Sequence, residues 1–193
     1  VPAADATLHF FNMEHPVVGG YTPEKVALRR AIALAYNSEE EIRLPRRNQA
    51  IPAQGPIVPT TYGYDPKFKT EMSEFSRPRA SALLDLFGYA DRDGDGWRDL
   101  PDGKPLLLVY ATTPSARDRE LNEVWKKNMD AVGIKTEFKV AKWPEHLKAA
   151  RAGKCWDGVE KETKLPKYAA WPGYEAGLPF VLRRYCGLWG RGT

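Results

Sequence analysis

The chain has 193 residues, of which 42% are hydrophobic and 28% are charged, as is ordinary for a globular protein with one sizeable core or two small ones. The net charge is only +4, and no basic tract carries interleaved aromatic residues, so we expect no nucleic-acid partner. No apolar run is long enough to span a bilayer, and no signal segment opens the sequence, as expected of a mature chain, a fragment or a cytosolic protein.

The first segments are predicted to form one strand and two helices. Residues 6–13 favour a strand. Apolar residues at helical spacing then predict a helix over 22–37, with Thr22 as its N-cap. A second short helix is predicted over 38–42, capped by its own first residue. The glutamates at 39–41 are interpreted as the solvated face of that helix.

The next segment is rich in proline. Five prolines interrupt residues 45–66, which excludes a long helix there. Isoleucine, valine and tyrosine side chains in this segment offer surface to bury, so we expect an ordered loop that packs against the core. A disordered linker is the alternative.

The middle of the chain predicts a helix followed by a β-α-β unit. The helix runs over 78–88, where a proline fits the first turn and a glycine the end. The unbroken apolar run at 106–110 predicts a strand that is covered on both faces. A helix over 115–132 and a half-buried, alternating strand over 134–140 complete a β-α-β unit at 105–140. Its two strands are expected to be parallel neighbours joined by a right-handed crossover.

An acidic turn separates the helix from this unit. Asp91, Asp93, Asp95 and Asp99 offer carboxylates at alternate positions, as a calcium loop does. The terminal glutamate and the second helix of such a loop are missing. A solvent-facing turn, in which aspartate and glycine supply the backbone angles, explains the same residues and is the interpretation we prefer.

The pattern changes after Lys154. Neither helical nor strand periodicity persists, so we divide the chain into an α/β domain over 1–154 and an irregular aromatic tail over 155–193. Within that tail, Trp171 and Tyr174 are candidate ligand contacts, although core packing would use the same residues.

No recognisable catalytic motif occurs. The sequence has no glycine-rich phosphate loop and no nucleophile elbow, so we expect no enzyme, with a hydrolase that lacks a known motif as a remaining alternative. Cys155 and Cys186 have no histidine near them in sequence. Whether they form a disulfide in an oxidising compartment is left open by the sequence.

Several short motifs occur in a specific order. They are Phe11-Asn12-Met13 at the end of the first predicted strand, the helix 26–37 with Asn37 at a position usually held by aspartate, and the segments 52–59, 80–84, 88–89, 93–96, 102–106 and 132–135. In this order and spacing the chain resembles lobe II of the bacterial extracellular solute-binding proteins that serve ABC importers of peptides and nickel, the dipeptide- and oligopeptide-binding family. The resemblance covers about residues 8–154. Pro172-Gly-Tyr174, Pro179-Phe180 and Arg183 are faintly similar to the family's C-terminal segment, so a C-terminal family segment that follows a deletion is the alternative to an irregular tail over 155–193.

The resemblance implies a periplasmic-binding-protein-like α/β lobe with a mixed sheet and flanking helices. It implies a substrate-binding component, or a fragment of one, that binds peptides or similar small solutes by lobe closure and needs no cofactor. The implied partners are an ABC permease in the membrane and the missing lobe I, and the implied location is periplasmic or extracytoplasmic. A calcium-dependent interaction domain built on Asp91 to Asp102 is the alternative function.

Overall fold

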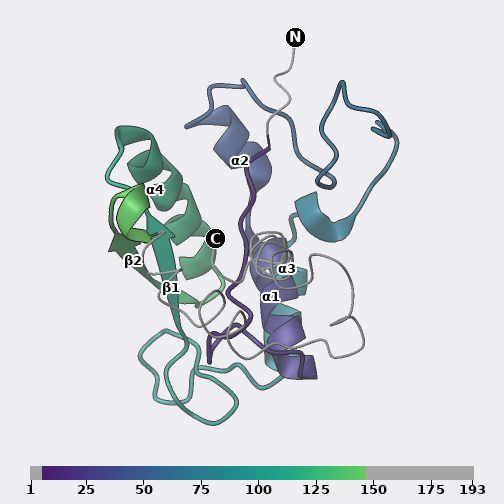
Figure 1. The fold of residues 1–193 in the computed structure, drawn as a ribbon. Helices are drawn as coiled ribbons and strands as arrows, with labels where there is room; N and C mark the ends of the chain where they lie inside the picture. Colours follow the sequence, from purple (N-terminus) through teal and green to yellow (C-terminus); the bar gives the residue numbers. More distant parts are fainter. Residues whose placement is uncertain (1–5, 147–193) are drawn as a thin grey trace, which may run out of the picture. The chain divides into compact units, whose positions relative to one another are not determined.

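The computed structural model describes residues 6–146 (Figure 1). The chain divides into two units, Val1–Lys139 and Val140–Thr193, and the elements below belong to the first, except for the last residue of the second strand. The predicted domain boundary at 154 and the predicted tail lie outside the described residues, so the division at that point stays a prediction. Among the described residues, no helix combines the length and the apolar surface that crossing a bilayer needs.

The first helices follow the predicted positions closely. Helix α1 spans Pro23–Ala35, with Thr22 at the N-cap position, and it buries a face of leucine, isoleucine and alanine. Helix α2 spans Ser38–Arg43. Its cap is Asn37 and not Ser38, because the Asn37 side chain accepts a hydrogen bond from the Glu40 backbone N–H at 3.0 Å.

Helix α3, Arg77–Leu86, lies beside α1 (Figure 1). It begins where the Ser76 side chain accepts from a backbone N–H of the first turn, and it ends before Gly88, which has φ +79°. The Ser76 N–H also donates to the Leu34 carbonyl at 2.8 Å, which connects the start of α3 to the end of α1. A short 3-10 helix, η1 (Glu71–Ser73), precedes α3.

The β-α-β unit is present. Strands β1 (Leu107–Thr112) and β2 (Lys135–Val140) pair in a two-stranded parallel sheet, and α4 (Ala116–Asp130) connects them. The prediction that β1 is covered on both faces is wrong, because Leu108 is 5% exposed but Val109 is 50% exposed. An apolar run alternates its side chains across the sheet, and the described residues cover only one side.

The core joins the helices to this unit. The most deeply buried apolar side chains come from α1, α3, α4 and the segments next to the strands, and they are Leu28, Ile32, Leu84, Tyr89, Leu106, Met129 and Ile134. Burial of each such side chain stabilises the fold by about 2 kcal/mol. The core therefore fixes α1, α3 and α4 around one apolar centre.

The strand predicted at 6–13 does not form. Residues 6–12 form neither a helix nor a strand. Phe11 is half-buried against the core, and Phe10 is 72% exposed. A strand requires a hydrogen-bonded partner strand, and the described part of the chain provides none for this segment. The strand prediction for residues 6–13 is therefore wrong.

Candidate ligand-binding site

A hollow of about 740 Å³ opens beside α2. Its walls are the segments 49–59 and 63–69, with Thr7 and Arg117 at the edge. This volume is within the range of small-molecule sites, about 300–1,000 Å³. All of the described residues that line it belong to the first unit of the chain.

The proline-rich segment forms the walls because it does not collapse onto the core. Contrary to the prediction of core packing, Ile51 is 57% exposed, Ile57 is 50% exposed and Tyr62 is fully exposed. The base of the segment is closed by Thr70, whose backbone N–H and hydroxyl both contact Gln54 at 2.9 Å. Prolines keep the chain between Gln54 and Thr70 out of regular helix, and backbone hydrogen bonds from Thr61 to Val58, from Tyr64 to Thr61 and from Phe68 to Asp65 close three turns, so the segment curves around an open volume.

Arg46 and Glu41 form an ion pair at the inner side of the hollow. The Arg46 Nε–H donates to Glu41 Oε1, and the Tyr36 hydroxyl donates to Glu41 Oε2. Both charged side chains are largely buried, with 13% of Arg46 and 10% of Glu41 exposed. A buried ion pair of this kind is held by hydrogen bonds on both carboxylate oxygens, which satisfies the acid completely.

Local backbone structure places this pair. The Arg46 N–H donates to the Glu41 carbonyl at 3.2 Å, and the Asn48 N–H donates to the Ile42 carbonyl at 2.8 Å. Arg47 has φ 50° and Asn48 has φ 60°, a left-handed conformation that turns the chain out of α2 and toward the walls of the hollow.

A cluster of aromatic rings adjoins the ion pair of Glu41 and Arg46 through Tyr36. The His9 ring lies 5.0 Å from the Tyr36 ring and 5.1 Å from the Trp125 ring, and Tyr110 lies 4.6 Å from Trp125. Burial, followed by the charge of Glu41, raises the pKa of Tyr36, and burial raises the pKa of Tyr110 to about 12. Loss of water around the ring lowers the pKa of His9, although His9 as a residue is exposed.

A second ion pair connects α2 to α4. The Lys127 ammonium donates to Glu40 Oε1 at 2.5 Å, and the Glu40 side chain is 8% exposed. This hydrogen bond lowers the pKa of Glu40. The interpretation of the glutamates as a solvated face is therefore right for Glu39 and wrong for Glu40 and Glu41, because α2 packs its next two side chains against cations.

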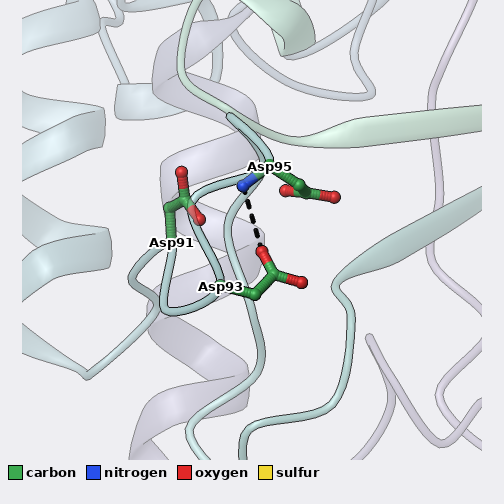
Figure 2. Close-up of side chains that lie close together, drawn as sticks. All are labelled: Asp91, Asp93 and Asp95. Atoms are coloured by element: carbon green, nitrogen blue, oxygen red, sulfur yellow. Dashed lines mark hydrogen bonds between the residues drawn. The ribbon is translucent and has the colours of Figure 1, made fainter.

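The acidic turn is exposed. Carboxylate oxygens of Asp91, Asp93 and Asp95 lie within 4.8 Å of one another, and Figure 2 shows the three side chains around one tight loop. This spacing would allow them to hold a cation. Asp99 is not part of this group, since it is 6% exposed and accepts from the Arg92 N–H at 3.0 Å.

Backbone hydrogen bonds already use these carboxylates. Asp91 accepts from the N–H groups of Gly94 at 2.8 Å and Gly96 at 3.0 Å, and Asp93 accepts from the Asp95 N–H at 3.1 Å (Figure 2). These are the local bonds by which aspartate stabilises turns. The geometry agrees with the interpretation of a surface turn and leaves the calcium alternative as a prediction.

The remaining candidates fall elsewhere. Trp171, Tyr174, Cys155 and Cys186 lie outside the described residues, so their predicted roles stay predictions. Sequence reasoning missed the pair of Glu41 and Arg46. The one signal in the sequence is that a glutamate and an arginine lie five residues apart across the end of a short helix. Pairs with this spacing are also common on exposed surfaces, so the spacing alone does not predict a buried ion pair.

An α/β unit with an open hollow and a paired guanidinium inside it has the features of a protein that binds a small polar ligand. Comparisons with known proteins identify the protein family. Residues 1–165 match the family model of the bacterial extracellular solute-binding proteins, family 5 Middle. The chain belongs to this family, which confirms the resemblance described above.

One curated relative is di/tripeptide-binding protein 2 of Pseudomonas aeruginosa (strain UCBPP-PA14). It is 30% identical over 128 residues, which cover 65% of this chain and 22% of the relative. The chain thus spans little more than a fifth of the length of that protein.

Solved structures have the same fold. The oligopeptide-binding protein AppA from Bacillus subtilis, in complex with a nonapeptide, matches with a TM-score of 0.64 and 20% identity over 73% of this chain and 27% of that one. An oligopeptide-binding protein OppA matches with a TM-score of 0.60 and 27% identity over 67% of this chain and 20% of that one. The predicted α/β fold of a periplasmic-binding-protein lobe is therefore confirmed.

Proposed function

We propose that this chain is part of the substrate-binding component of an ABC importer and that it contributes to a binding site for short peptides. The observation that carries the proposal is the family match over residues 1–165, together with a relative named for di- and tripeptides. The whole protein would add the other lobe, act outside the cytoplasmic membrane and deliver its ligand to a permease. Its task would be binding, with no bond made or broken.

The hollow beside α2 is the part of this chain that we assign to the ligand. Its walls offer apolar side chains, among them Ile51, Ile57 and Phe68, and the guanidinium of Arg46 lies within it. A peptide has the matching features, since its side chains are often apolar and its backbone and terminus supply acceptors. Mostly apolar walls with a few placed polar groups are typical of ligand sites.

The test is a titration of the 193-residue chain with trialanine, followed by NMR of the backbone amides. We expect saturable shifts at residues 49–69 and a weak, millimolar-range affinity, because the chain supplies only part of the site. An Arg46→Gln variant should lose most of this binding, and an Arg43→Gln variant, changed at an exposed arginine of α2, should keep it. Absence of saturable shifts, or hydrolysis of the peptide during the titration, would contradict the proposal.

A further inference from the structure

Glu41 has an unusual position for an acidic residue of a short surface helix. It is 8% exposed, and each of its carboxylate oxygens accepts one hydrogen bond, from Tyr36 and from Arg46. The Tyr36 ring itself contacts the rings of His9 and Trp125. The carboxylate is therefore fixed from the core side, and it is the fixed member of the pair with Arg46.

The guanidinium has a free edge. Its Nε–H is used by Glu41, and its two terminal nitrogens have no hydrogen-bond partner among residues 6–146. Arg46 lines the hollow and is mostly buried. The terminal nitrogens are not among the buried side-chain atoms that lack a partner, so they are open to the hollow, and a charged N–H edge of this kind is suited to an acceptor that a ligand brings.

The charges around the hollow favour an acceptor with one negative charge. The charged residues described in its lining are two acids, Glu41 and Asp65, and three bases, Arg46, Lys69 and Arg117. Their net charge is +1. A ligand with one net negative charge would balance it, and a second net negative charge would not be balanced. Without Glu41 the hollow would carry two uncompensated positive charges.

We infer that Glu41 is a positioning and specificity-determining residue of this hollow: it holds Arg46 by its Nε–H, directs the terminal N–H edge to the ligand, and limits the ligand to a single net negative charge. The inference rests on the proposed function, because the ligand is taken to be a peptide. Glu41 lines the hollow and acts through Arg46 and through its own charge.

The binding test compares two tripeptides of nearly equal shape, Ala-Gln-Glu and Ala-Glu-Glu, which carry one and two net negative charges because each has an ammonium and a terminal carboxylate besides its acidic side chains. The wild-type chain should bind Ala-Gln-Glu more tightly. In Glu41→Gln the preference for Ala-Gln-Glu, measured as the ratio of the two dissociation constants, should fall by about fivefold, because one nearby negative charge is removed. Glu39→Gln is the matched control, since it removes an exposed charge from the same helix. An equal change of the ratio in both variants would overturn the inference.

A second measurement reports on Arg46 without any ligand. The Arg46 Nε–H, assigned by its loss in Arg46→Lys, should give a resonance that exchanges slowly with water. Tyr36→Phe, which removes one of the two hydrogen bonds to Glu41 and keeps the ring, should speed this exchange severalfold. Fast exchange in the wild-type chain would overturn the positioning role. If neither tripeptide binds, the proposed function and the specificity role fail together, while a protected Nε–H still supports the positioning role.

Discussion

Two acidic runs of this chain have opposite environments. The aspartates 91, 93 and 95 are all exposed, and their carboxylates accept hydrogen bonds from the backbone of their own loop. In the glutamate run, Glu40 and Glu41 are each 8% exposed and pair with Lys127 and Arg46. The run that resembles a metal site forms a turn, and the run that resembles a solvated face is buried.

The difference shows that neighbouring residues in space decide what a carboxylate does. A carboxylate in a polar turn needs only the N–H groups that follow it in sequence. A carboxylate in the interior needs a cation and further donors, because burial of an unpaired charge is strongly unfavourable. Mutations should therefore have large effects at the buried glutamates and small effects at the aspartates.

The largest expected effect is that of Arg46→Leu. Glu41 would lose its cation while it stays buried, and we expect the free energy of unfolding to fall by about 3 kcal/mol. Urea denaturation followed by circular dichroism measures this. The control is Arg47→Leu, at an exposed neighbour that has the same left-handed backbone, and it should change stability by less than about 0.5 kcal/mol.

A double variant sharpens this result. Adding Glu41→Leu to Arg46→Leu removes the stranded charge, so the double variant should lose less stability than the sum of the two single variants. Strict additivity would mean that the two side chains do not depend on one another, which contradicts the ion pair.

A smaller effect is expected for Lys127→Met. Glu40 is buried but the Lys127 side chain is 63% exposed, so solvent screens the pair and we expect a loss of about 1 kcal/mol near pH 7. Lys126→Met, at an exposed pair with Asp130 within one helix, should cost less than about 0.5 kcal/mol. Equal losses in the two variants would mean that burial of Glu40 adds nothing to the pair.

The same pair gives a pH dependence. Because the pKa of Glu40 is lowered on folding, its stabilising contribution is present above the ordinary carboxyl pKa of 4.5 and is lost as the pH falls through the lower folded value. The wild-type chain should therefore lose more stability than Lys127→Met between pH 5 and about pH 3. Parallel pH profiles would contradict this assignment.

The boundaries of most elements could be predicted from the sequence because their signals are local. The Ser115 side chain caps α4, and glycines with positive φ follow α3 and α4. The β-α-β unit likewise follows from apolar periodicity. For these elements the information lies within a few residues of each boundary.

The candidate site could not be predicted in this way. Glu40 is paired with a lysine 87 positions later in the chain, and Glu41 depends on Tyr36, which lies in the ring cluster formed with His9 and Trp125. No local pattern contains these contacts. The strand predicted at 6–13 failed for the same reason, since pairing depends on a partner from another part of the chain.

A smaller effect, on the pH dependence of stability, is expected from His9 in the ring cluster. Its pKa is lowered on folding, mainly by burial, so its contribution to stability is complete above the unfolded value of 6.5 and decreases as the pH falls below it. His9→Phe keeps a ring beside Tyr36 and Trp125 and should remove the part of the slope of melting temperature between pH 7.5 and about pH 5.5 that comes from this residue. An unchanged slope in the variant would show that His9 does not titrate differently on folding.

The smallest effect is expected at the aspartates. If the loop is a surface turn, millimolar calcium should leave the melting temperature unchanged in the wild-type chain and in Asp93→Ala with Asp95→Ala. The backbone bonds that these two residues accept lie at the surface, where water replaces them, so the double variant should lose less than about 1 kcal/mol. A rise in melting temperature with calcium that disappears in the double variant would instead assign a cation to Asp91, Asp93 and Asp95, and the two acidic runs would then share one property, the need for a positive partner.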